Sequence, residues 1–283
     1  MASKKENTYR ILLFGDSFTA GEGVSNEYRY GDLLESMIDT FEVYNFGLPG
    51  SGTDQQYLVY KEFAAGIEHD LLLIVILVEN IRRVAGHYRV WRDESGGHLI
   101  YAKPYFELVD GSLILKNVPP PSGPLSESAL SKEEKNFVDQ GGRFPGIEKL
   151  VAKLGAKDLV QKMVKFQPYP EYNSPNNPTW RVMQAILQEW INNHPGQVLL
   201  MPLPLYQHLE EMSDPSSYQA RFREVASATG CMLYDPLPDL LRYPLVERRG
   251  FRSRRDPHLT QEGHAALATC LTPVLQGLRN SGG

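Results

Sequence analysis

A serine near the start of the chain and a histidine near its end are the residues best suited to nucleophilic chemistry. Ser17 follows a short apolar run that ends in Gly15 and Asp16. An apolar run bounded by glycine indicates a buried strand leaving a sheet. In an open α/β sheet, the residue just beyond the carboxyl end of a strand lies in the crevice where ligands bind. Ser17 is therefore expected in a binding crevice. The plainer alternative is a turn in which Asp16 or Ser17 caps the next helix.

The base that such a serine needs is offered by His258, which stands just before a C-terminal helical pattern. Asp256 lies two residues earlier, and Pro257 favours an extended backbone there. Side chains at positions i and i+2 of an extended segment point the same way, so the Asp256 carboxylate is placed to orient the imidazole. The alternative is an Asx turn beside a solvated histidine.

The other histidines show no such pattern. His264 is expected on the packing face of the last helix, for which Thr260 is the predicted N-cap. The remainder are expected at the surface without an acidic partner: His69, His87, His98, His194 and His208.

Two further strand ends offer donors for an oxyanion. The run 45–53 contains three glycines, and a glycine there would let a backbone N–H point into the crevice. Asn80 follows the apolar run 71–78 and carries a side-chain amide. Each also has a plain interpretation, as a glycine–proline turn and as a polar residue closing a strand.

Strand and helix patterns alternate along most of the chain, which favours a parallel sheet covered by helices. The stretch 82–179 breaks this alternation and is longer than ordinary βα loops. We interpret it as an insertion within a single domain spanning 1–283, forming a lid or side wall over the crevice. The expected strands are 9–14, 41–46, 71–78, 197–203 and 231–234, and the expected helices are about 30–39, 54–67, 180–193, 215–228 and 261–278.

Inside the insertion, Asp110 and Gly111 separate the runs 105–109 and 112–116, which predicts a hairpin. A helical pattern follows near 147–164. The aromatic residues of the insertion could line a substrate pocket or pack a small core of their own: Tyr88, Trp91, Tyr101, Tyr105 and Phe106.

Composition argues against several classes of protein. The 283 residues are 42% hydrophobic and 22% charged, as in ordinary globular proteins. A net charge of -5 argues against general nucleic-acid binding, because phosphate contacts need a surplus of Lys and Arg. The first eight residues hold no apolar signal core, and the run 71–78 is too short to span a bilayer. We expect a cytoplasmic protein without nucleic-acid or membrane partners, in which Cys231 and Cys270 are reduced.

In their order along the chain, the segments around Ser17, 45–53, Asn80 and His258 resemble the conserved sequence blocks of the SGNH/GDSL hydrolase family. The resemblance covers most of the chain outside the insertion. Ser17 matches the family's nucleophile and one oxyanion N–H donor. Gly50 matches the oxyanion glycine of the second block, and Asn80 matches the asparagine of the third. Asp256 and His258 match the acid and base of the last block. The resemblance implies a three-layer α/β/α sandwich with a five-stranded parallel, flavodoxin-like sheet, and ester hydrolysis or acyl transfer without a cofactor or a metal ion.

Two blocks depart from the family pattern. The third is usually Gly-x-Asn-Asp, whereas Val78 and Ile81 flank Glu79-Asn80 here. The last is usually Asp-x-x-His, whereas Arg255 stands three residues before His258. The Asp-x-His spacing is similar to that of bacterial polysaccharide O-acetyltransferases. The group that orients the imidazole is therefore either Asp256 or a backbone carbonyl.

A group of arginines precedes His258 in a chain that is acidic overall: Arg248, Arg249, Arg252, Arg254 and Arg255. Arginine pairs well with phosphate and carboxylate. This predicts an anionic substrate or acyl donor, such as a phosphorylated carrier, a coenzyme A thioester or an acidic sugar, with Asp16, Arg254 and Arg255 as substrate-binding residues. The alternative is a solvated loop.

Three functions are compatible with these residues. The first is a serine-dependent ester hydrolase of the deacylase or deacetylase type, acting on a small-molecule or carbohydrate ester. The second is an O-acyltransferase that uses the same site on a carbohydrate or other small-molecule hydroxyl. The third is a catalytically inactive binding module with the same fold.

Overall fold

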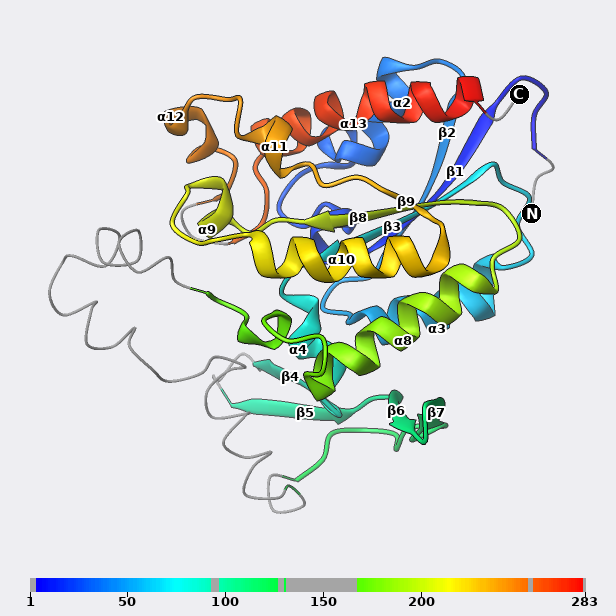
Figure 1. Ribbon diagram of the computed structural model, residues 1–283, viewed down its shortest axis with the longest axis vertical. Helices are drawn as coiled ribbons and strands as arrows, with labels where there is room; N and C mark the ends of the chain where they lie inside the picture. Colours follow the sequence, from blue (N-terminus) through cyan, green and yellow to red (C-terminus); the bar gives the residue numbers. More distant parts are fainter. Residues whose placement is uncertain (1–3, 93–96, 127–129, 131–166, 254–256, 282–283) are drawn as a thin grey trace, which may run out of the picture.

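A computed structural model describes residues 4–92, 97–126, 130, 167–253 and 257–281. At its centre is a five-stranded parallel sheet with the order β2-β1-β3-β8-β9 (Figure 1). This is the strand order of flavodoxin-like sheets, so the predicted fold class is confirmed. The strands lie where the sequence predicts them: β1 (Tyr9–Gly15), β2 (Phe41–Gly47), β3 (Leu71–Leu77), β8 (Gln197–Leu203) and β9 (Met232–Leu233).

Helices cover both faces of the sheet. On one face α2 (Tyr30–Met37) packs against α13 (Gln261–Ser281) (Figure 1). The other face carries α3 (Thr53–Val59), α8 (Pro178–Asn192) and α10 (Ser216–Thr229). The remaining helical segments are short: α1 (Ser17–Ala20), η1 (Asn26–Tyr28), a single π turn η2 (Tyr60–Ala64), α4 (Asn80–Ala85), η4 (Pro170–Tyr172), α9 (Tyr206–Leu209), α11 (Leu237–Leu240) and α12 (Leu245–Arg248).

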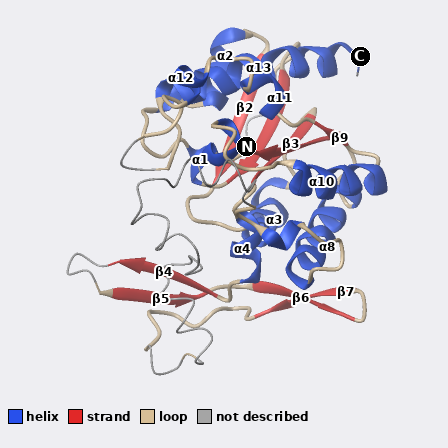
Figure 2. Cartoon of the chain, turned by 60° about the vertical axis from the view of Figure 1, so that its left-hand side comes forward, coloured by secondary structure: helices blue, strands red, loops and turns tan. Residues whose placement is uncertain are grey.

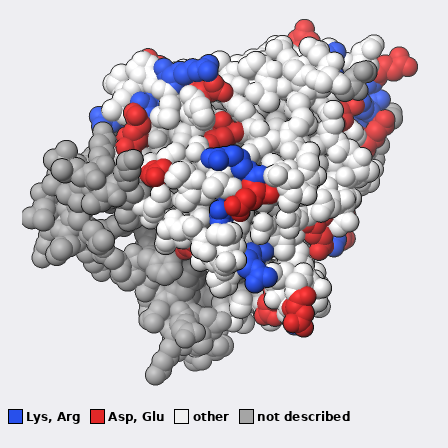
Figure 3. Space-filling view, viewed as in Figure 1, with Lys and Arg blue, Asp and Glu red and all other residues white. Residues whose placement is uncertain are grey.

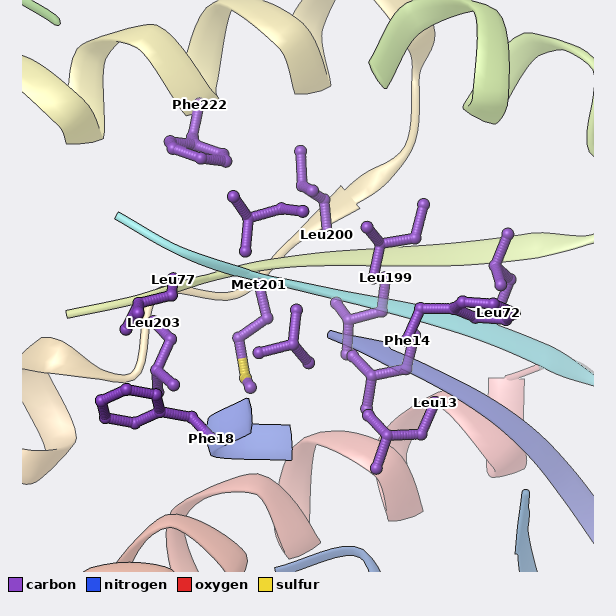
Figure 4. Packing of buried hydrophobic residues seen from close by; sticks show 14 of the residues in the cluster. Leu13, Phe14, Phe18, Leu72, Leu77, Leu199, Leu200, Met201, Leu203 and Phe222 are labelled. Carbon is purple, nitrogen blue, oxygen red and sulfur yellow. The ribbon is translucent and has the colours of Figure 1, made fainter. Parts of the chain in front are cut away.

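The core follows from the apolar strands. Every residue of β1 and β3 is buried, as expected for strands covered on both faces. Figure 4 shows Phe222 entering from α10 on one side of the sheet, with Leu13 and Phe18 on the other. Phe14 stacks on Phe46 with ring centroids 4.9 Å apart. Burying each large apolar side chain stabilises the fold by about 1.5–3 kcal/mol. This packing holds the carboxyl ends of the strands in fixed positions.

The segment 82–179 contributes two antiparallel hairpins, one formed by β4 (Tyr88–Arg92) and β5 (His98–Ala102), the other by β6 (Tyr105–Val109) and β7 (Ser112–Lys116) (Figure 2). The second hairpin is the predicted one, and both of its turn residues have positive φ, as a tight hairpin turn requires. The helix predicted near 147–164 lies outside the described residues.

Side chains also join these hairpins to the main sheet. Lys103, between the hairpins, makes a buried ion pair with Asp54 of α3. Phe106 of β6 is buried in the main core, where it packs near Tyr57. Within the described part of the chain, no helix combines the length and the apolar character needed to cross a bilayer.

The surface positions predicted for two histidines are wrong. His194 is only 8% exposed and its Nδ1 hydrogen-bonds to the Tyr60 hydroxyl at 2.9 Å. His208 is 3% exposed and its Nδ1 accepts a bond from the backbone N–H of Leu205 at 3.3 Å. Each ring is the hydrogen-bond partner of a buried polar group, the Tyr60 hydroxyl or the Leu205 N–H. The pattern of residues along the sequence does not reveal such a partner. His264 is buried on the packing face of α13, as predicted.

Replacing His208 should reduce the dependence of stability on pH. Burial lowers the pKa of His208 from 6.5 to about 4. Below about pH 6.5 the unfolded chain therefore takes up a proton that the folded chain refuses, so stability falls as the pH drops toward 4, by up to about 1.4 kcal/mol per pH unit. Urea unfolding of the wild type and His208→Gln, at about pH 7.5 and about pH 5, should show a smaller loss in the variant. Equal losses would contradict the assignment, and a comparison above about pH 7 serves as the control, since His is neutral there in both states.

Candidate active site

Ser17 lies directly beyond the carboxyl end of β1, at the first residue of α1. The Asp16 carboxylate caps this helix by accepting a hydrogen bond from the backbone N–H of Phe18 at 3.0 Å. The plainer interpretation of the turn, in which Asp16 caps the next helix, is therefore confirmed. The cap leaves the Ser17 hydroxyl available, and the residue is 4% exposed.

The structure brings His258 to this hydroxyl across 241 residues of chain. Its Nε2 lies 2.8 Å from Ser17 Oγ, and its ring packs on Phe18 with centroids 4.9 Å apart. The loop that carries the ring is closed by a bond from the Thr260 N–H to the Phe251 carbonyl, 3.0 Å long. The Thr260 hydroxyl then accepts from the N–H of Gly263 at 3.2 Å, which starts α13 as predicted. A nitrogen base and a hydroxyl at this distance can exchange a proton.

A carboxylate that the sequence pattern does not assign to the site lies beside this pair. Glu22 Oε2 is 3.4 Å from His258 Nε2, and the Glu22 side chain is 53% exposed. In the sequence, the only hint of this contact is that Glu22 stands between Gly21 and Gly23, close to Ser17.

One guanidinium joins the ends of three strands. Arg83 of α4, which follows β3, donates from Nη1 to Asp16 Oδ2 and to the carbonyl oxygen of Ser51, each at 3.1 Å. Its Nη2 lies 3.7 Å from Glu79. Burial raises the pKa of Asp16, and the charge of Arg83 opposes that shift. These contacts favour a structural role for Asp16 over the substrate contact predicted from the sequence.

The predicted oxyanion residues lie at neighbouring strand ends. Because β1 runs between β2 and β3, Gly50 and Asn80 follow the strands on either side of Ser17. Gly50 has a φ of +70°, a left-handed conformation that favours glycine. Asn80 is fully buried, and among the described residues neither atom of its side-chain amide has a hydrogen-bond partner. Leaving such a buried amide unpaired costs about 1–3 kcal/mol.

Most of the arginine group is already paired. Arg248 binds Glu211 at 2.8 Å, and Arg252 binds Glu210 at 2.9 Å. Arg249 lies 3.7 Å from Glu210. On the face shown in Figure 3, groups of basic and acidic side chains lie close to one another and do not form one continuous basic patch. These three arginines therefore form a structural ion-pair network. Arg254, Arg255 and Asp256 lie outside the described residues.

Among the described residues, no group of three or more His, Cys, Asp or Glu side chains could hold a metal ion. The hydroxyl and the imidazole, in contact at one edge of the sheet, can carry out proton transfer and nucleophilic attack.

No protein-family model and no curated protein matches the chain. Solved structures do match it. An acetyl xylan esterase, AlAXEase, is 16% identical with a TM-score of 0.50, and the match covers 94% of this chain and 99% of that one. The chain has the SGNH hydrolase fold.

Two further solved structures are similar to this chain at lower sequence identity. The gut microbial diltiazem-metabolizing enzyme BT4096 is 11% identical with a TM-score of 0.50, and the match covers 97% of this chain and 48% of that one. A member of the lipolytic protein G-D-S-L family from Veillonella parvula is 12% identical with a TM-score of 0.47, and the match covers 95% of this chain and 99% of that one.

Placing alanine at Gly50 should disturb the site in a way that an equivalent change elsewhere does not. A left-handed φ costs a non-glycine residue about 1–2 kcal/mol. A Cβ atom at Gly50 would also collide with Nη2 of Arg89. Gly230 has nearly the same φ, +71°, but open space around its missing Cβ. Gly50→Ala should lose at least as much stability as Gly230→Ala in denaturant unfolding, and only Gly50→Ala should slow the labelling of Ser17 by a fluorophosphonate. Equal labelling rates in the two variants would contradict the placement of Gly50 at the site.

Proposed function

We propose that this protein is a serine-dependent ester hydrolase of the deacylase or deacetylase type, with Ser17 as nucleophile and His258 as base. The observation that carries the proposal is the 2.8 Å contact between Ser17 Oγ and His258 Nε2 at the carboxyl edge of the parallel sheet. This distance lies within the reach that general-base catalysis requires, about 2.6–3.2 Å.

In the proposed reaction His258 Nε2 removes the hydroxyl proton as Ser17 Oγ bonds to the ester carbonyl carbon. The ester oxygen then leaves with that proton as an alcohol, and an acyl-serine remains. Water then attacks the acyl carbon and gives a proton to Nε2. Nε2 returns that proton to Ser17 Oγ as the bond between the acyl carbon and Oγ breaks, which releases the carboxylic acid and regenerates the serine hydroxyl. The developing oxyanion is held by the backbone N–H groups of Ser17 and Gly50 and by the Asn80 amide. Removing one such donor typically costs about 100- to 1000-fold in turnover.

Asp256 is the proposed acid that orients the imidazole and stabilises its charged form, on the strength of the Asp-x-His spacing. The same spacing motivates the second candidate function, an O-acyltransferase. In that reaction an acceptor hydroxyl replaces water in the second step. Adding an acceptor alcohol and measuring acyl-alcohol against free acid distinguishes the two.

Ser17→Ala should abolish both ester hydrolysis and fluorophosphonate labelling, because only an activated serine reacts. The wild type is expected to release 4-nitrophenol from 4-nitrophenyl acetate and to carry the label on Ser17 in peptide mapping. Ser36, an exposed serine on α2, offers a matched control, and Ser36→Ala should keep both properties. Labelling or full turnover in Ser17→Ala would refute the assignment, and an unlabelled wild type would support the inactive binding module.

Asp256→Asn should lower kcat by about 100- to 10,000-fold while changing KM little, because the lost charge acts on the transition state. The exposed Asp39 provides the control, and Asp39→Asn should leave both constants unchanged. If Asp256→Asn kept the wild-type kcat, a backbone carbonyl would be the group that orients the ring.

A further inference from the structure

Strand β4 presents two different faces, because side chains alternate along a strand. Tyr88 and Val90 pack on Ile100 and Leu130, which form a small core separate from the main one. Arg89 and Trp91 therefore point to the opposite side of the hairpin. Of the insertion's aromatic residues, Tyr88 thus packs on the small core, whereas Trp91 faces away from it.

The opposite side of β4 lies against Gly50. The space next to the Gly50 Cα is filled by Nη2 of Arg89, and the Trp91 ring would come within 3.4 Å of a Cβ built there. The guanidinium carbon of Arg89 is 6.0 Å from the centre of the Trp91 ring. The insertion therefore forms a side wall next to one of the proposed oxyanion donors, and that wall ends in a cation and an aromatic ring.

Arg89 differs from the charged groups around it. Arg83 is bound by Asp16 and Glu79, and Lys103 is bound by Asp54. Arg89 makes no hydrogen bond or ion pair within the described part of the chain, although its side chain is half-buried. Burial and the nearby charge of Arg83 lower the pKa of Arg89 to about 10, so it stays protonated at neutral pH. A half-buried cation without a partner is stabilised by any anion that reaches it.

We propose that Arg89 and Trp91 form a specificity wall that selects esters carrying a carboxylate or phosphate group close to the reacting carbonyl. Arg89 pairs with the anion, for which its planar guanidinium is well suited. The ring of Trp91, 50% exposed, packs against the carbon skeleton that carries the anion. This substrate class rests on the proposed function. It also places the anion site on the insertion and not on arginines 248, 249 and 252, which are paired with Glu210 and Glu211.

The test compares matched esters that differ by one anionic group. The carboxylate pair is mono-4-nitrophenyl succinate and 4-nitrophenyl pentanoate, and the phosphate pair is 1-acetylglycerol 3-phosphate and 1-acetylglycerol. The wild type should prefer the anionic member of at least one pair by tenfold or more in kcat/KM, since a charge-assisted hydrogen bond is worth about that much. The pair that shows the preference identifies the anion.

Arg89→Met should reduce this preference by about tenfold or more, chiefly by raising KM for the anionic ester. Arg89→Lys keeps the charge without the planar fork and should retain part of the preference. Arg242, 81% exposed and paired with Asp239, provides the control, and Arg242→Met should keep the wild-type ratio. The proposal is refuted if the wild type hydrolyses both members of each pair equally, or if Arg89→Met slows both members by the same factor.

Failure of the proposed function gives a different result, namely no ester turnover and no fluorophosphonate label on Ser17. The anion site is then tested by tryptophan fluorescence during titration with succinate or inorganic phosphate, because Trp180 and Trp190 are fully buried and Trp91 is exposed. A saturable change that Arg89→Met abolishes supports an anion site on this wall. No change in the wild type overturns it.

Discussion

The bond network of Arg83 is the constraint on which the site depends. One guanidinium, carried by the helix after β3, binds the Asp16 carboxylate after β1 and the Ser51 carbonyl after β2. A parallel sheet brings strand ends to one edge, but it does not determine how the chain leaves them. Asp16 is 1% exposed, and a buried carboxylate without a partner would cost several kcal/mol. The ion pair therefore makes one arrangement of the three loops far more stable than the others, and that arrangement places Ser17 between Gly50 and Asn80.

The remaining half of the site comes from the far end of the chain. His258 is held by a short loop whose ends meet through the backbone bond between Phe251 and Thr260, and Thr260 also begins α13. Because α13 packs on α2 across one face of the sheet, the imidazole is positioned by the core itself. The proposed nucleophile and base are thus each placed next to an element of the core, β1 for Ser17 and α13 for His258.

Much of this was predictable from local patterns. Leu71–Leu77 is apolar throughout and could only be a strand covered on both faces. The serine and the histidine were recognisable from their neighbours and their place relative to expected elements. The partners that act across long distances were not recognisable. Arg83, Glu22 and Arg89 are ordinary charged residues until the fold sets them beside Asp16, His258 and Gly50, and the burial of His194 depends on a tyrosine 134 residues away.

The buried pair between Lys103 and Asp54 has a mechanical consequence. Asp54 stands four residues after Gly50, at the start of α3, and Lys103 connects the two hairpins of the insertion. Removing one partner of such a buried pair costs about 3–5 kcal/mol, because the other charge is left buried and unpaired. The hairpin that carries Arg89 and the turn that carries Gly50 are consequently both held by this ion pair. A displacement of one is transmitted to the other, so mutations that reshape the outer strands for a new substrate would also shift the position of Gly50.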